Sequence, residues 1–162
     1  MSPKSTLAGL ISGTILVLDQ GTKFLVDKTM AMHQSIDIIP NFASLTYLRN
    51  TGAAFGFLAG SRSGSRIVFF ALISSAAIGC IVYLIRGLRP QQKTLLLSLS
   101  LILGGAVGNL IDRLRLGEVI DFIDLHWYDV HWPAFNVADS AISIGVVLLF
   151  IRMLHKGSLT SG

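Results

Sequence analysis

Four stretches of the chain are nearly continuous runs of apolar residues. They lie at about residues 6–26, 67–86, 94–111 and 139–154. A helix that crosses a bilayer needs about 20 mostly apolar residues, and each run reaches or approaches that length. The pattern therefore predicts four transmembrane helices. The first run resembles a secretory signal, but charges at Asp19 and Lys23 stand where a small-residue cleavage site belongs, so we expect an uncleaved span.

Two longer connections separate these runs, and their polar and apolar residues follow different patterns. Segment 27–66 mixes β-branched and aromatic residues with turn formers such as Pro40 and Asn41, which predicts a few short strands. Segment 112–138 holds both tryptophans, a residue type enriched where membrane meets water, which predicts a loop on the membrane surface. We therefore expect one all-α membrane domain of 162 residues, with a small β-rich segment and a surface loop on its outer side.

The distribution of charge predicts the orientation of the four spans. The N-terminus, the connection at residues 86–93 and the C-terminal tail carry six basic residues and no acidic one. Because basic connections stay in the cytoplasm, both termini are expected there, with the two longer segments on the outer face. All nine acidic residues fall in those two segments or within a span, which agrees with this orientation.

The composition supports a membrane protein and argues against several other classes. Hydrophobic residues make up 52% of the chain and charged residues only 14%, against roughly 25% in an average soluble domain. The net charge of +4 follows from the basic cytoplasmic parts, and no stripe of Lys and Arg interleaved with aromatic residues predicts a nucleic-acid partner. Cys80 stands alone in an apolar run, so no disulfide or cysteine zinc site is expected.

Two carboxylates are candidates for chemistry because of their surroundings. Asp121 stands between two large apolar residues, and Asp139 opens the last apolar run, so both are expected near the apolar boundary. If the fold holds them close together, they can share one proton, as the acids of an aspartic protease do. The alternative is structural: Asp139 could cap its helix together with Asn136, while Asp121 could meet water or Arg113.

Further polar residues share helix faces with these positions. Asn109, Asp112 and Arg113 are spaced i, i+3 and i+4 at the outer end of the third run, so they lie on one face. Arg113 could hold a substrate carbonyl or pair with an acid. In the first run Asp19 and Lys23 are spaced i, i+4 in the order that favours an ion pair, which predicts a structural clamp and leaves a functional role open.

Five motifs, in order along nearly the whole chain, resemble those of the bacterial lipoprotein signal peptidases, the signal peptidase II family. They are "LDQGTK" (18–23), "RNTGAAFGF" (49–57), "GGAVGNLIDR" (104–113), "VIDFIDLHW" (119–127) and "PAFNVADSAI" (133–142). The resemblance implies a membrane aspartic endopeptidase that removes the signal peptide of diacylglyceryl-modified prolipoproteins, cutting on the amino side of the lipidated cysteine. It also implies a bacterial inner-membrane location, with the active site near the outer face.

The resemblance also assigns roles to individual residues. It implies two catalytic acids, Asp121 and Asp139, and two supporting residues of the first span, Asp19 and Lys23. It further implies six residues that bind substrate or shape the site: Asn50, Gly52, Asn109, Asp112, Arg113 and Asn136. The expected partners are lipidated prolipoproteins and membrane lipid. No metal and no other cofactor is expected, and we expect a monomer.

Other classes of membrane protein fit the motifs less well. A proton-coupled transporter would show two related halves with broken helices, and none are visible. A zinc protease is not supported, because the four histidines form no H-E-x-x-H pattern. A serine hydrolase is disfavoured by the absence of a G-x-S-x-G motif. A purely structural four-helix membrane protein remains an alternative, and it predicts that both acids are replaceable.

Overall fold

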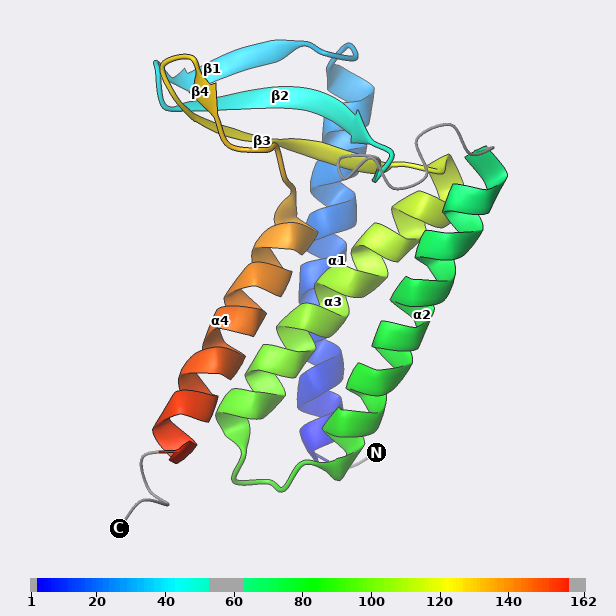
Figure 1. Ribbon diagram of the computed structural model, residues 1–162, viewed down its shortest axis with the longest axis vertical. Coiled ribbons are helices and arrows are strands. Elements are labelled where there is room, and N and C mark those ends of the chain that lie inside the picture. Colours follow the sequence, from blue (N-terminus) through cyan, green and yellow to red (C-terminus); the bar gives the residue numbers. More distant parts are fainter. Residues whose placement is uncertain (1–2, 53–62, 158–162) are drawn as a thin grey trace.

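Four helices run side by side, and a small sheet covers one end of the bundle (Figure 1). The computed structural model describes residues 3–52 and 63–157, so positions 53–57 of the second motif lie outside the described residues. The helices are α1 (Pro3–Thr29), α2 (Ser63–Gly87), α3 (Lys93–Leu116) and α4 (Val137–Gly157). Each predicted apolar run lies within one of them, and every helix extends beyond its run.

Helix α3 lies at the centre of the bundle and packs against the other three. Glycines on α3 allow this close approach. At Gly104, an added Cβ would lie 2.8 Å from the Ser12 carbonyl oxygen of α1, and at Gly105 it would lie 2.8 Å from the Ile142 side chain of α4. Small residues let the backbones of membrane helices come together, so these glycines determine how tightly α1 and α4 bracket α3.

Three helices of the described chain are long and apolar enough to cross a membrane: 67–87, 93–116 and 137–154. Helix α1 is 27 residues long but is less apolar, because it carries Asp19, Lys23, Asp27 and Lys28. The crossing by α1, and with it the count of four spans, therefore stays a prediction. Large apolar side chains such as Val17, Leu72 and Phe150 are exposed, as expected on surfaces that contact lipid.

The sheet is antiparallel, in the order β1-β2-β3-β4. Strands β1 (Ser35–Ile39) and β2 (Ala43–Asn50) come from the first long segment, as predicted. The second long segment differs from the expected surface loop, since it contains the end of α3, strand β3 (Val119–Trp127) and strand β4 (Val130–His131). Strand β3 requires a partner that lies more than 70 residues away, in register Leu48 with Asp121, and no local pattern reveals such pairing.

The connection from α3 into β3 is tight. Gly117 caps α3 at φ 77°, a left-handed conformation that favours glycine, and its N–H donates to the Arg113 carbonyl at 3.0 Å. Beneath the sheet, five buried residues form one apolar cluster: Val26 of α1, Met30 directly after α1, Tyr47 of β2, and Ile120 and Phe122 of β3. This cluster holds the C-terminal end of α1 against β2 and β3, which positions the polar side chains that these three elements carry.

Candidate active site

The start of α4 is closed by a reciprocal cap. The Asp139 N–H donates to Asn136 Oδ1 at 2.9 Å, and the Asn136 N–H donates to Asp139 Oδ2 at 3.3 Å. This is the arrangement of a capping box, which satisfies backbone donors at a helix start. Asp139 Oδ1 accepts a further hydrogen bond, from Asn109 Nδ2 at 2.7 Å. Capping and a place in a polar site are therefore not alternatives, because the same carboxylate does both.

Asn136 connects the two candidate acids. Its side chain is fully buried, and Nδ2 donates to Asp121 Oδ1 at 2.7 Å while its backbone and Oδ1 bond to Asp139. The same Nδ2 lies 3.2 Å from the Ile120 carbonyl oxygen, so the amide also ties α4 to β3. A single asparagine thus brings together two carboxyl groups that are 18 positions apart in the sequence.

Asp121 is the more buried of the two acids, with 3% of its surface exposed. Its oxygens accept hydrogen bonds from Asn136 Nδ2 and from Asn50 Nδ2, the second at 3.0 Å. Burial raises the pKa of Asp121 to about 6, and the negative charge of Asp139 adds to the rise, while the two amide donors oppose it. A carboxyl group with such a pKa can be protonated or ionised near neutral pH, as acid–base chemistry requires.

Gly52 determines which end of the Asn50 amide faces Asp121. The Gly52 N–H donates to Asn50 Oδ1 at 2.8 Å, which leaves the Asn50 NH₂ group for the carboxylate. Gly52 itself has φ 75°, and an added Cβ would lie 2.8 Å from the Phe70 ring. Both the backbone conformation and the space require glycine here.

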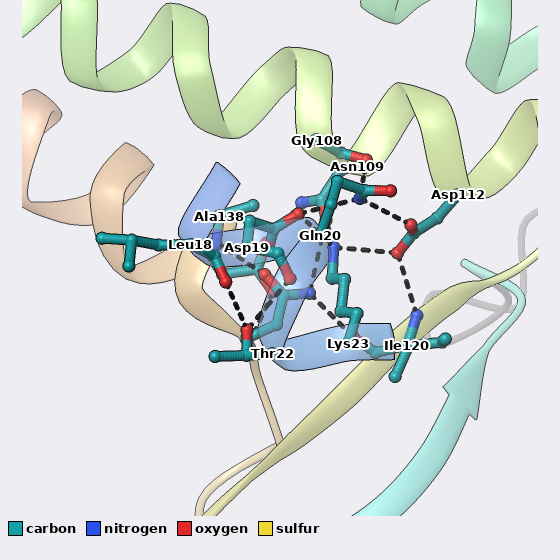
Figure 2. A network of polar contacts seen from close by, with 12 residues as sticks. Leu18, Asp19, Gln20, Thr22, Lys23, Gly108, Asn109, Asp112, Ile120 and Ala138 are labelled. Carbon is teal, nitrogen blue, oxygen red and sulfur yellow. Dashed lines mark hydrogen bonds and ion pairs between the residues drawn. The ribbon is translucent and has the colours of Figure 1, made fainter. Parts of the chain in front are cut away.

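Asp19, Lys23 and Asp112 form a buried charge cluster between α1 and α3 (Figure 2). Lys23 Nζ is 2.9 Å from Asp19 Oδ2, 2.8 Å from Asp112 Oδ2 and 2.9 Å from Asn109 Oδ1. The ion pair predicted from the i, i+4 spacing is therefore present, but it includes a second carboxylate from α3. Asp19 Oδ1 also accepts the Ala138 N–H at 2.9 Å, which attaches α1 to the first turn of α4.

Asn109 joins this cluster to the acid pair. Its Oδ1 accepts from Lys23 and its Nδ2 donates to Asp139, so one side chain of α3 contacts both groups. At Gly108, an added Cβ would overlap the Asp19 carboxylate, so a glycine is needed for the close approach. The cluster thus holds Asn109 in the orientation that presents its amide to Asp139.

Asp112 and Arg113 occupy different environments although they are adjacent. Asp112 is buried in the charge cluster, where Oδ2 also accepts the Ile120 N–H at 3.3 Å, so it supports the start of β3. Among the ion pairs of the described residues Arg113 has none with an acid. Its guanidinium donates to the Asn109 carbonyl at 3.2 Å and lies 5.5 Å from the centre of the Phe70 ring.

Two residues of this region were missed by the sequence analysis. Gln20 Nε2 donates to Asp112 Oδ1 at 2.9 Å and to the Gly108 carbonyl at 3.2 Å, so it links α1 to α3. Its position inside an apolar run, next to Asp19, was a signal that could have found it. Phe70 packs against Arg113 and borders Gly52, and an aromatic residue in an apolar run carries no such signal.

Asp139 is accessible from a cavity of about 490 Å³ on α4. The cavity is lined by Trp132, Pro133, Ala134, Phe135, Asp139, Ser140, Ser143 and Ile144. An extended or lipid-bearing ligand could therefore reach one acid from the side of the bundle, while the other stays buried. In the described part of the chain, no three His, Cys, Asp or Glu side chains form a group that could hold a metal ion.

A family model described as signal peptidase (SPase) II matches residues 11–155. The chain belongs to the signal peptidase II family. Lipoprotein signal peptidase from Geobacter metallireducens is 51% identical over 155 residues, which cover 96% of this chain and 94% of that protein. The corresponding protein from Geobacter sulfurreducens is 55% identical over 141 residues, 87% of each chain. The family resemblance inferred from the motifs is thus confirmed.

Solved structures agree with this assignment. A bacterial membrane enzyme determined by the in meso method at 2.3 Å resolution is similar to this chain, with a TM-score of 0.84 and 36% identity, over 96% of this chain and 92% of the other. A second such structure, at 1.9 Å, gives a TM-score of 0.82 and 37% identity. Family membership and the three apolar helices together fit an integral bacterial membrane protein.

Proposed function

We propose that this signal peptidase II is an aspartic endopeptidase in which Asp121 and Asp139, the acid pair, perform the chemistry. Its substrate is a prolipoprotein whose cysteine carries a diacylglyceryl group, and it cuts the peptide bond on the amino side of that cysteine. The observation that supports the proposal most directly is the hydrogen bonding of both acids to Asn136, which places two carboxyl groups at one site.

The acid pair can hydrolyse a peptide bond with no covalent intermediate. With one proton between them, the ionised carboxylate takes a proton from water while the protonated one donates to the carbonyl oxygen. The water oxygen bonds to the carbonyl carbon. The C–N bond then breaks as the leaving nitrogen takes the proton that the first carboxyl group gained from water, and the proton on the former carbonyl oxygen returns to the other carboxylate, which restores the pair. The pKa of about 6 for Asp121 supports a shared proton near neutral pH, which belongs to the pair and not to one residue.

The arrangement of the site suits a substrate that is anchored in the membrane. Asp139 lies in the first turn of α4, and Asp121 lies on β3 directly above the bundle (Figure 1). With both termini in the cytoplasm, this end of the bundle faces outward at the bilayer boundary. The cavity on α4 opens beside Asp139 and gives a lipidated chain a lateral route to the acids.

The first experiment is cleavage of a diacylglyceryl-modified precursor by the purified protein in lipid. We expect cleavage on the amino side of the modified cysteine, at least about 10-fold slower turnover of the unmodified precursor, since the lipid supplies binding energy for positioning, and no loss of activity with a chelator. Equal rates on both precursors would contradict the proposed preference for a diacylglyceryl-modified substrate. Loss of activity with the chelator, restored by added metal, would contradict the aspartic mechanism.

A further inference from the structure

Three polar side chains outside the acid pair form a compact cluster between α1 and β2. The Tyr47 hydroxyl donates to Asp27 Oδ1, and Arg49 donates from Nε to the Tyr47 oxygen at 2.9 Å and from a terminal nitrogen to Asp27 Oδ1 at 3.0 Å. Each of the three residues therefore bonds to the other two. We call this cluster of Asp27, Tyr47 and Arg49 the β2 latch.

Tyr47 is the most buried of the three residues of the latch. Tyr47 is only 3% exposed, and its ring belongs to the apolar cluster beneath the sheet. Burial, together with the hydrogen bond to Asp27, raises the pKa of Tyr47, so the hydroxyl keeps its proton and remains a donor at neutral pH. Asp27 and Arg49 are about one third exposed, which reduces the strength of their ion pair and leaves Tyr47 as the main connection.

The latch ends directly beside a residue of the candidate site. Arg49 is followed by Asn50, the last residue of β2, whose Nδ2 donates to Asp121 Oδ2. Successive side chains of a strand point to opposite faces, so the latch holds one face of β2 against α1 while Asn50 faces the acid. A shift of β2 away from α1 would therefore move the Asn50 amide relative to Asp121.

Asn50 pairs with Val119 of β3 in a short stretch that follows an irregularity in the register. The register between β2 and β3 is interrupted between Leu45 and Leu48, so the end of β2 is not continuous with the earlier part of the ladder. At the interruption, the Tyr47 backbone bonds instead to His33 and Gln34, each at 2.9 Å. After it, only three residues of β2 pair with β3, and the latch provides a second attachment for this short end.

We infer that Asp27, Tyr47 and Arg49 are positioning residues of the acid pair, which act by holding the end of β2 so that Asn50 keeps its hydrogen bond to Asp121. The inference rests on the proposed function. It assigns no contact with substrate to the latch. Its consequence is that a change at Tyr47 affects the ionisation of Asp121 through Asn50.

The pH profile of cleavage distinguishes positioning from simple structural support. The Asn50 hydrogen bond stabilises the ionised form of Asp121, so weakening it raises the pKa of Asp121. Lys23, Asp139 and Arg113 also act on the charge of Asp121, but none belongs to the latch. For Tyr47→Phe we expect the limb of the kcat/KM profile controlled by Asp121 to move to higher pH by about half a unit to one unit, because complete loss of a hydrogen bond to a charged group corresponds to about one to two units and this change only weakens the bond.

Matched variants make the test specific. Asn50→Ala should move the same limb at least as far, and adding Tyr47→Phe to it should move the limb no further, because both act on one hydrogen bond. Asp27→Ala removes the acceptor that α1 supplies to the latch and should shift the limb in the same direction as Tyr47→Phe. Tyr128→Phe, at an exposed tyrosine in the turn between β3 and β4, is the control and should leave the profile unchanged.

The position of a pH limb does not depend on the amount of active enzyme, so partial loss of folded protein does not obscure the result. If Tyr47→Phe lowers the melting temperature but keeps the wild-type profile, the latch is only a structural connection and the inference is overturned. If the double variant of Tyr47→Phe and Asn50→Ala shows a larger shift than Asn50→Ala alone, the effect of Tyr47 does not act through Asn50. That result would also overturn the inference. Failure of the wild type to cut the lipidated precursor would instead overturn the proposed function, and the inference with it.

Discussion

Asp121→Asn and Asp139→Asn should each lower the rate of signal-peptide cleavage at least about 1,000-fold, while the protein stays folded in the membrane. An amide neither takes a proton from water nor donates one as an acid, so either change removes half of the acid–base chemistry. The side chain keeps its size, so packing around Asn136 is preserved. The measurement is single-turnover cleavage of the lipidated precursor by equal amounts of folded protein.

The control for this result is Asp129→Asn, an identical change at an exposed acid in the turn between β3 and β4. It should cleave at the wild-type rate. Turnover by Asp121→Asn or Asp139→Asn within about 10-fold of this control would contradict the assignment of the acid pair, since general acid–base catalysis contributes at least about 100-fold. For Asp139 the carboxylate would then be left with its role as a helix cap, which the structure already shows.

The pH dependence of stability provides the folding control. The pKa of Asp121 rises from 3.8 in the unfolded chain to about 6 in the folded one, so between these values the folded state binds more protons. Stability is therefore expected to fall as the pH rises from about 4 to 6, and the loss is complete above 6. Asp121→Asn lacks this group, so its melting temperature relative to wild type should increase over the same interval.

Lys23→Met should remove most of the folded protein. Lys23 is 2% exposed and, among the described residues, is the one cation within 3 Å of both Asp19 and Asp112, so its loss leaves two buried carboxylates without a compensating positive charge. Breaking a buried ion pair in this way costs about 3–5 kcal/mol, a large part of the 5–15 kcal/mol by which proteins are stable. The measurement is the yield and melting temperature of the purified protein in detergent.

Two comparisons give this prediction its specificity. Lys28→Met, on the exposed part of the same helix, should leave yield and melting temperature unchanged. Asp19→Asn should be less damaging than Lys23→Met, because one carboxylate and one ammonium group remain paired. If Lys23→Met instead folds like the wild type and loses only turnover per folded molecule, the charge cluster belongs to the mechanism and not to the fold.

Features determined by residues close together in the sequence were predicted well. The helices follow from the length of the apolar runs, and the contact of Asp19 with Lys23 follows from their spacing on one helix. The cap formed by Asn136 and Asp139 was likewise foreseen from a spacing of three residues. Each of these depends on neighbours within one or two turns, so local spacing carries the information.

The partners of the site residues depend on pairs far apart in the sequence, and only the tertiary structure decides them. From the sequence, Asp121 and Asp139 were acids near an apolar boundary, but their connection through Asn136 and Asn109 arises from the packing of α3 and α4 beneath β3. The spacing placed Asp112 on one helix face with Asn109 and Arg113, but its ion-pair partner Lys23, 89 positions away, is decided by the tertiary structure.

Strand β3 is a further feature that only the tertiary structure decides. Its residues were expected to form a surface loop, because a strand is defined by hydrogen bonds to a partner, and that partner, β2, lies on the other side of two helices in the sequence. The sequence by itself determined which segments are apolar, which end of the molecule carries the acids and how neighbours on one helix pair. Tertiary packing decided which distant side chains form hydrogen bonds and ion pairs with one another in the buried site, since desolvation and hydrogen bonding depend on contacts that spacing along the chain does not specify.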